Sequence, residues 1–142
     1  MELRKATMAD ALDLLNWKND LQTIKFSIVT NGIITWSNHC AWLERRLKKP
    51  GFYIITDGKD KCGDLRFDFG EETEISVRIN PKFRGQWIAT QAVALGCEMY
   101  AETLVAKIVE GNLASLNVFT RNGFVFKDYV KGEKNYYVLK RV

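Results

Sequence analysis

The stretch Asn80-Pro81-Lys82-Phe83-Arg84-Gly85-Gln86-Trp87-Ile88-Ala89-Thr90 joins a segment with strand-like alternation to a segment with helical periodicity. It therefore predicts a strand, a loop and the beginning of a helix. A helix N-terminus presents unpaired backbone N–H groups and the positive end of the helix dipole, and both favour a phosphate or pyrophosphate. Gly85 and Ala89 are small enough to let a ligand approach the backbone. We interpret Arg84–Thr90 as an anion-binding corner; the alternative is an ordinary turn between strand and helix.

Strand patterns surround this corner. Apolar residues alternate with polar ones from Asp64 to Phe69 and from Glu74 to Ile79, which is typical of strands with one buried face. The turn signal Asp57-Gly58-Lys59-Asp60 and the glycine at Gly132 predict hairpins. The predicted strands are Glu2–Ala6, Phe52–Thr56, Cys62–Phe69, Thr73–Ile79, Leu104–Val109, Phe124–Lys131 and Asn135–Arg141.

Three further segments have apolar residues at helical spacing. The predicted buried faces carry Met8, Leu12 and Leu15 in the first, Trp36, Cys40, Leu43 and Leu47 in the second, and Ile88, Ala92, Leu95 and Met99 in the third. Asn112–Asn122 predicts a fourth helix, closed by Gly123. Leu21–Ile34 has no clear period and predicts an irregular segment with a short helical turn, and Asn31-Gly32 within it predicts a chain turn.

Interspersed strands and helices, with runs of adjacent strands, predict an α+β fold with a mixed, mainly antiparallel sheet flanked by about four helices. The 142 residues fit a single domain spanning residues 1–142. The formal charge of +4 is scattered, and no basic stripe with interleaved aromatic residues indicates nucleic-acid binding. Cys40, Cys62 and Cys97 form no metal set, so we expect a reduced, cytoplasmic setting. We expect no signal peptide and no membrane span.

The corner lacks the glycine spacing and lysine of a nucleotide-triphosphate loop, and it is no dinucleotide fingerprint. Arg84–Thr90 instead resembles the acyl-CoA loop of the GNAT N-acetyltransferase superfamily: an Arg or Gln, two residues, Gly, one residue, then Gly or Ala. Asn112-Leu113-Ala114-Ser115, followed by Phe119 and Gly123-Phe124, resembles the family's motif after its fifth strand. The order of elements also agrees over nearly the whole chain.

The resemblance implies a GNAT fold and an acyl-CoA N-acyltransferase with acetyl-CoA as cosubstrate. It implies contacts to that cosubstrate from Ile79, Arg84, Gly85, Gln86, Trp87, Ile88, Ala89, Thr90, Asn112, Ser115 and Phe119.

Two positions depart from the family pattern. The family usually has Gly at the position of Trp87, so this ring must point away from the cosubstrate, where it could alter affinity or line the acceptor site. The family often has a tyrosine that protonates the departing thiolate at the position of Phe119, and phenylalanine donates no proton. Tyr129, Tyr136, Tyr137 or water could replace it, or the thiolate could leave unprotonated at little cost near neutral pH.

The mechanism that the resemblance implies is direct transfer to an amine, without a covalent enzyme intermediate. Several members of the family place a carboxylate at the position of Glu74, and it is the candidate general base; the alternative is an exposed carboxylate with no role. The backbone N–H near Ile79 would polarise the thioester carbonyl. The cysteines are not needed as nucleophiles.

For the acceptor, Trp17-Lys18-Asn19-Asp20, His39 with Trp42, and Gly63–Asp68 look like a GNAT branch that acetylates nucleotide-linked amino sugars, including the enzyme of pseudaminic acid biosynthesis. Acceptor contacts are then implied for Trp17, His39 and Arg66. The alternatives are a packing tryptophan, a hydrogen-bonded structural histidine and a surface ion pair. A similar Trp-Asn-Asp signature also occurs in ribosomal-protein and spermidine acetyltransferases.

Three functional classes therefore remain open. They are an amino-sugar N-acetyltransferase, an acetyltransferase for a protein N-terminus, polyamine or drug, and an acyl-CoA-binding module without catalysis. We expect a monomer or a homodimer that binds neither nucleic acid nor membrane.

Overall fold

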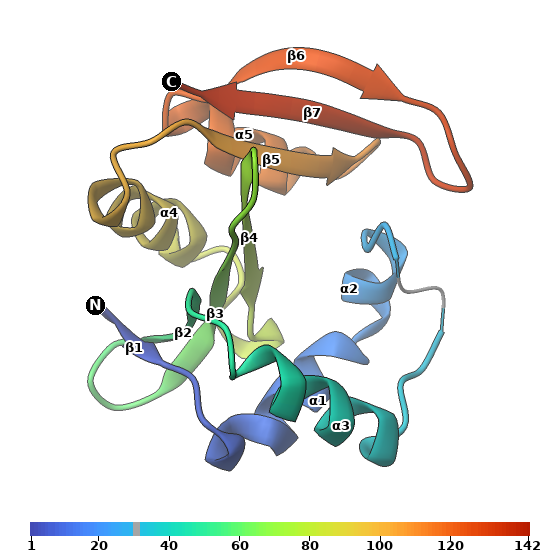
Figure 1. Cartoon of the computed structure of the whole chain (residues 1–142), viewed down its shortest axis with the longest axis vertical. Coiled ribbons are helices and arrows are strands. Elements are labelled where there is room, and N and C mark those ends of the chain that lie inside the picture. The colour runs from blue at the N-terminus through green and yellow to red at the C-terminus, as the bar shows by residue number, and fades with distance from the viewer. Residues whose placement is uncertain (30–31) are drawn as a thin grey trace.

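The computed structural model describes residues 1–29 and 32–142, and seven strands of these residues form one sheet in the order β1-β2-β3-β4-β5-β7-β6 (Figure 1). The strands are β1 (Glu2–Lys5), β2 (Phe52–Thr56), β3 (Lys61–Asp68), β4 (Thr73–Ile79), β5 (Leu104–Val109), β6 (Val125–Val130) and β7 (Tyr136–Arg141). Neighbouring strands are antiparallel except β4 and β5, which are parallel. The mixed, mainly antiparallel sheet is confirmed, and every predicted strand end lies within one residue of its observed position.

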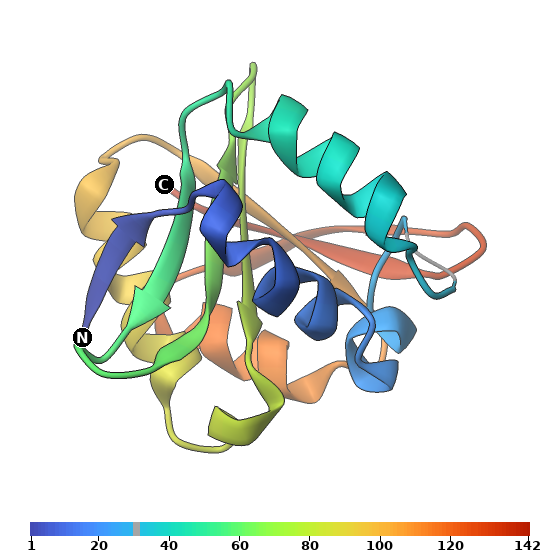
Figure 2. The same ribbon diagram turned by 90° about the horizontal axis from the view of Figure 1, so that it is seen from below.

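Helices cover both faces of this sheet. They are α1 (Ala11–Lys18), α2 (Leu21–Lys25), α3 (Trp36–Arg46), α4 (Ile88–Met99) and α5 (Leu113–Arg121), with 3₁₀ turns at Met8–Asp10 and Pro81–Phe83. Figure 2 shows α1 and α3 side by side over the half of the sheet formed by β1 to β4. Among the described residues, no helix has the length and apolar character needed to span a bilayer. Asn31 lies outside the described residues, so the turn predicted there is not among the observed features.

The helix faces predicted from apolar spacing were partly wrong. Met8 and Leu12 are 44% and 60% exposed, and Trp36 and Met99 are also exposed. The buried positions are Ala11, Leu14, Leu15 and Trp17 in α1, His39, Leu43 and Arg46 in α3, and Ala92, Val93, Gly96 and Cys97 in α4. The reason is that polar and small residues take core positions. At Gly96, an added Cβ would lie only 3.1 Å from the Phe67 ring, so glycine lets α4 lie directly on the sheet.

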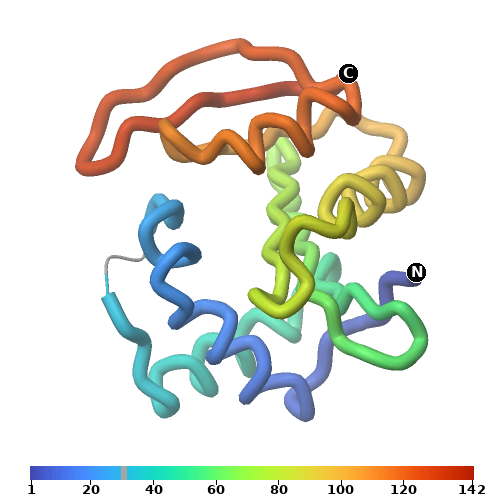
Figure 3. Tube along the Cα trace, turned by 180° about the vertical axis from the view of Figure 1, so that it is seen from behind, coloured from blue at the N-terminus to red at the C-terminus, as the bar shows by residue number. Residues whose placement is uncertain are grey.

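The only parallel contact within the described sheet is also its shortest. β4 pairs with β5 at two positions, where Thr73 faces Leu104 and Glu74 faces Val105. Beyond these pairs the two strands diverge, and Figures 1 and 3 show from opposite sides how β5, β6 and β7 turn away from β1 to β4. The sheet is therefore divided into two halves, β1 to β4 and β5 to β7. The segment that follows β4 lies between these halves, with α4 at one side and α2 at the other.

Candidate functional site

The predicted strand, loop and helix of the corner are confirmed. Asn80 begins the 3₁₀ turn by accepting the Lys82 N–H at 3.2 Å, and its own N–H donates to the Cys62 carbonyl at 2.8 Å. Gly85 has φ = 79°, a left-handed conformation that glycine adopts without strain. The helix begins at Ile88. Its first-turn N–H groups, from Ile88 to Thr90, have no partner within the helix and are available to an anion.

Trp87 caps this helix in the left-handed region, with φ = 64°, and no other described residue except glycine has a positive φ. A side chain in this conformation crowds the following carbonyl, which is why glycine is preferred here. The indole ring is 59% exposed, and the Arg121 guanidinium of α5 lies over it, 4.6 Å from the ring centroid. The ring thus packs outward against α5, as the sequence requires if the helix N-terminus is to accept a ligand.

The Arg84 side chain is directed toward α2. Its Nη2 atom lies 2.7 Å from Asp20 Oδ2 and 3.3 Å from Thr23 Oγ1, and its Nη1 atom lies 3.4 Å from Gln22 Oε1. The Arg84 guanidinium lowers the pKa of the Asp20 carboxyl below its usual range. Because this guanidinium is already paired, the anion-binding capacity of the corner comes from backbone N–H groups.

The opposite end of α2 is held from the other half of the sheet. Lys134, in the turn between β6 and β7, donates to the carbonyl oxygens of Ile24 and Ser27 at 2.7 and 2.6 Å. The short helix α2 is therefore fixed to the corner by Arg84 and to the terminal hairpin by Lys134 (Figure 1). It connects the two halves of the sheet on the side away from α4.

Ile79 presents its backbone to the region between the diverging strands. It faces Gly63 on β3, and the residue after it, Asn80, donates its N–H to the Cys62 carbonyl. Because hydrogen bonds alternate along an antiparallel pair, the Ile79 N–H is directed away from β3, toward the side from which β5 has diverged. The N–H of Val77 has the same direction, a donor that the sequence motifs did not indicate.

Glu74 lies at the other end of β4, where β4 and β5 still pair. Its Oε1 atom is 3.4 Å from the Nζ atom of Lys107 on β5, and both side chains are partly exposed. It shares a face of β4 with Ser76 and Arg78, because side chains of a strand alternate between faces. Glu74 and Ile79 are five positions apart along the strand, about 16 Å at 3.3 Å per residue.

The second motif forms the beginning and core side of α5. Asn112 caps the helix by accepting the Ser115 N–H at 3.3 Å, and it also donates to Ser115 Oγ at 3.1 Å. Phe119 is 3% exposed and packs edge-to-face on Phe124, so it has little surface for the cosubstrate contact that was predicted. Tyr129, an alternative proton donor, donates instead to Glu110, and burial followed by this bond raises its pKa.

The three predicted acceptor residues have different environments. His39 is fully buried, and its Nε2 lies 2.8 Å from the Ala11 carbonyl oxygen, which is the environment that the structural alternative describes. Trp17 is 4% exposed and packs in the core between α1, α3 and the sheet. Arg66 lies closer to the surface, with its Nε 3.1 Å from Asp68 and its guanidinium 5.6 Å from the Trp42 ring centroid.

Lys18 joins Arg66 at Trp42; it lies in the motif Trp17–Asp20, but no acceptor contact was predicted for it. Its Nζ lies 3.2 Å from the Trp42 ring centroid and 3.4 Å from His39 Nδ1. Burial, and after it the charge of Arg78, lowers the pKa of Lys18 to about 7. The signal available in the sequence was the position of Lys18 one helical turn after a core leucine, next to a tryptophan.

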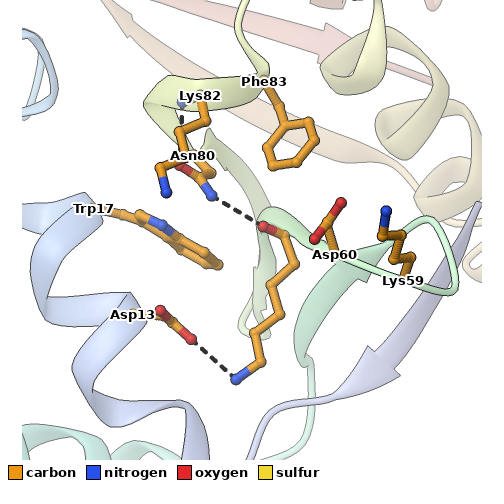
Figure 4. Close-up of a pocket in the computed structure, with 8 residues that line it drawn as sticks. Asp13, Trp17, Lys59, Asp60, Asn80, Lys82 and Phe83 are labelled. Atoms are coloured by element: carbon orange, nitrogen blue, oxygen red, sulfur yellow. Dashed lines mark hydrogen bonds and ion pairs between the residues drawn. The ribbon is translucent and has the colours of Figure 1, made fainter.

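A surface pocket of about 490 Å³ lies between α1, the turn joining β2 to β3, and the 3₁₀ turn at Pro81–Phe83 (Figure 4). Its lining residues are Asp13, Trp17, Lys59, Asp60, Lys61, Asn80, Lys82 and Phe83. Lys61 is committed to an ion pair with Asp13, and Asn80 donates to the Lys61 carbonyl, so polar contacts within the wall hold the pocket together. Of the predicted site residues, only the edge of Trp17 reaches it.

Comparison with known proteins agrees with this geometry. Residues 1–125 match the family model described as "Acetyltransferase (GNAT) domain". No match was found among curated proteins.

Several solved structures share the fold. A ribosomal-protein-alanine N-acetyltransferase from Brucella melitensis has a TM-score of 0.83 at 22% identity, covering 100% of this chain and 99% of that one. RimL, a ribosomal L7/L12 α-N-protein acetyltransferase solved with coenzyme A, has a TM-score of 0.85 at 18% identity, covering 99% and 92%. YncA from Salmonella typhimurium, solved with acetyl-CoA, has a TM-score of 0.78 at 20% identity, covering 99% and 92%.

Proposed function

The chain belongs to the GNAT acetyltransferase family and is an acetyl-CoA-dependent N-acetyltransferase, and we propose that its acceptor is the amino group of a nucleotide-linked amino sugar. The observation that carries this proposal is that the Arg66 guanidinium of β3 lies over the face of the Trp42 ring of α3. We call the face of the sheet that α1 and α3 cover the acceptor side. A guanidinium beside an aromatic ring suits a ligand that carries both a phosphate and a planar or sugar ring.

The corner at Arg84–Thr90 fits the pyrophosphate of the cosubstrate. Its helix N-terminus presents free backbone N–H groups, and the Trp87 ring is turned toward Arg121 and leaves them accessible. When bound, acetyl-CoA supplies an acetyl group activated as a thioester. We propose that the N–H groups of Ile79 and Val77 hold the carbonyl oxygen of that acetyl group and stabilise the negative charge that develops on it.

The amine must be neutral when it attacks, so a group of this chain has to accept its proton. We propose that Glu74 does so through a chain of water molecules along β4, because its carboxylate is partly exposed and lies about 16 Å from Ile79, beyond direct reach of the amine. Lys107 keeps this carboxylate oriented by an ion pair across the two diverging strands.

Phe119 stands where the family often has a proton-donating tyrosine. Of the alternative donors, Tyr129 is engaged with Glu110, and Tyr137 packs its ring against Tyr129 and Phe126. We therefore propose that the thiol leaves as a thiolate and takes its proton from water, which costs little because a thiol has a pKa near 8.5.

A protein N-terminus is the second candidate acceptor. It is favoured by the full-length structural likeness to the Brucella melitensis and RimL enzymes, both of which are ribosomal-protein acetyltransferases. We propose a cytoplasmic setting for either acceptor, since the three cysteines are all free thiols.

The test is release of free thiol from acetyl-CoA in the presence of a panel of amines: a nucleotide-linked 4-amino sugar, peptides with free N-termini, and spermidine. We expect the highest kcat/KM with the nucleotide-linked sugar. A preference for peptides would transfer the proposal to the second candidate. Tight acetyl-CoA binding without turnover on any amine would indicate a binding module without catalysis.

A further inference from the structure

Positive charge exceeds negative charge around Trp42. Lys18, Arg66 and Arg78 all face this region, and the nearby carboxylates are Asp64 and Asp68. Arg78 binds both oxygens of Asp64 at 2.9 and 3.1 Å. Asp68 accepts from Arg66, and its Oδ1 also lies 3.6 Å from the Nε of Arg46 on α3. Both carboxylates are therefore committed.

Lys18 is the cation left without a counter-ion. No carboxylate of residues 1–29 or 32–142 lies within ion-pair distance of it. Its neighbours are the Trp42 ring face and His39 Nδ1. The Nε2 of His39 points at the Ala11 carbonyl and must carry the hydrogen, so we assign Nδ1 as the bare nitrogen that accepts from Lys18. A π face and a lone pair stabilise a cation only in part.

The charges around Lys18 favour the binding of an anion. Burial and the nearby guanidiniums of Arg78 and Arg66 lower the pKa of Lys18 to about 7, although Asp64 acts in the opposite direction. Burial, and then the charge of Lys18, lowers the pKa of His39, which is consequently neutral at physiological pH. A half-buried cluster with surplus positive charge becomes more stable when an anion enters.

The cluster also lies on the face where the acceptor must arrive. Arg78 directly precedes Ile79, and its side chain projects from β4 on the same face as Ser76 and Glu74. Lys18 ends α1, only two residues before Asp20, which fixes α2 to the corner. An anionic group bound at Lys18 would thus be anchored beside the strand whose same face carries Glu74 and whose edge presents the N–H groups proposed for acetyl transfer.

We propose that Lys18 is a specificity-determining residue that binds an anionic group, phosphate or carboxylate, on the acceptor. This inference rests on the proposed acetylation of an acceptor amine and adds the chemical class of the acceptor. The Lys18 ammonium donates to the anion, Arg66 contributes long-range attraction, and the Trp42 ring provides an apolar surface beside it.

A dependence on pH follows from this arrangement. The groups that face Lys18 are His39 on α3, Asp64 and Arg66 on β3, and Arg78 on β4. Burial, and then the charge of Lys18, lowers the pKa of His39, so His39 is already neutral above pH 7. Lys18, with a pKa of about 7, loses its proton as the pH rises from 7 to 9, so anion affinity should fall by up to about tenfold per pH unit above pH 7.

The test compares Lys18→Met, which keeps the aliphatic stem on Trp42, with Lys18→Arg, which keeps a permanent charge. Each is assayed with matched acceptors: a nucleotide-linked amino sugar against the free amino sugar, and 4-aminobutyrate against butylamine. For the anionic member of a pair, we expect Lys18→Met to lower kcat/KM about 30-fold. For the uncharged member it should change kcat/KM by less than about threefold, as should the exposed control Lys48→Met. A loss confined to the nucleotide-linked sugar identifies phosphate as the bound group, and a loss confined to 4-aminobutyrate identifies carboxylate.

Equal losses with charged and uncharged acceptors would show that Lys18 is structural, and no loss with either would overturn the proposal. A binding arm separates this from failure of the proposed function. Uridine diphosphate is titrated into each variant by calorimetry in saturating coenzyme A, which occupies the corner at Arg84–Thr90. We expect wild-type affinity to fall between pH 7 and 9, Lys18→Arg affinity to stay constant, and Lys18→Met to bind weakly throughout. Undiminished binding by Lys18→Met would refute an anion site, whatever the acetylation assay gives.

Discussion

The two sides of β4 present different kinds of site. On the donor side, the corner at Arg84–Thr90 offers backbone N–H groups, and its most conspicuous side chains, Arg84 and Trp87, are engaged with α2 and α5. On the acceptor side, Lys18, Arg66 and Glu74 offer charged side chains from three different elements. The donor side depends on the conformation of one continuous segment, and the acceptor side depends on residues distant in sequence. A substitution should therefore act on one substrate and leave the other unaffected.

The largest effect should come from the acceptor side. Glu74→Gln should lower kcat by about 100-fold or more, because it removes the proposed proton acceptor while preserving shape. Acetyl-CoA affinity, measured by calorimetry, should stay within about threefold of wild type. The matched control is Glu72→Gln. Glu72 lies two residues before Glu74, and its substitution breaks an exposed ion pair with Lys140. Near-normal turnover in Glu74→Gln would remove Glu74 from the mechanism.

A substitution on the donor side should instead weaken acetyl-CoA binding and leave the acceptor unaffected. Ala89→Glu places a carboxylate in the first turn of α4, where it favours the helix but repels an anionic ligand. The KM for acetyl-CoA should rise about 30-fold, with the acceptor KM changing little. Ser37→Glu makes the same change at the same position of α3 and should leave both constants unaltered. If both variants weaken acetyl-CoA equally, the effect is one of net charge and not of the corner.

Substitutions at Trp87 should have a smaller effect, and they separate the contribution of the backbone conformation from that of the indole ring. Trp87→Gly and Trp87→Ala both remove the ring contact with Arg121, but only glycine relieves the left-handed φ of 64°. Trp87→Gly should therefore be about 1 kcal/mol more stable than Trp87→Ala in urea unfolding. Acetyl-CoA affinity should change by less than about threefold in the glycine variant. A large loss of affinity in both would show that the indole itself contacts the cosubstrate.

The smallest effect should be the coupling between Arg84 and Asp20. The ion pair is partly exposed, so solvent screens it, and a double-mutant cycle with Arg84→Met and Asp20→Asn should give about 0.5 kcal/mol. Arg84 lowers the pKa of Asp20, so this stabilisation is fully present above the unfolded pKa of about 4 and is lost as the pH falls through the lower folded value. Urea unfolding at pH 7 and pH 3 measures both quantities. A coupling energy of zero at pH 7 would show that the ion pair between Arg84 and Asp20 does not contribute to stability.

The same contrast explains what could be predicted from the sequence. Strands and the corner were predictable because their signals are local: alternation from Glu74 to Ile79 and small residues at a helix start. The helix faces were not, because His39 and Gly96 occupy core positions that apolar spacing does not mark. His39 is buried only because the Ala11 carbonyl, 28 residues earlier in the chain, provides its hydrogen-bond partner.

The acceptor side was likewise hidden. The importance of Lys18 depends on Trp42 and Arg78, which approach it only through the packing of α1 and α3 on the sheet. Conversely, Phe119 was expected at the cosubstrate because of a motif, but the packing of α5 turns it into the core. A local motif identifies a backbone conformation better than it identifies what each side chain touches.

The attachment of α2 has a consequence for folding order. A five-residue helix does not form stably in isolation, and its anchors Arg84 and Lys134 lie 64 and 110 residues from their partners Asp20 and Ile24. Loops this long close late, after local structure has formed. The segment Leu21–Lys25 is synthesised before both of its anchors, yet it reaches its final position only when the hairpin of β6 and β7 is in place. The helix that connects the two halves of the sheet is therefore among the last elements to be fixed.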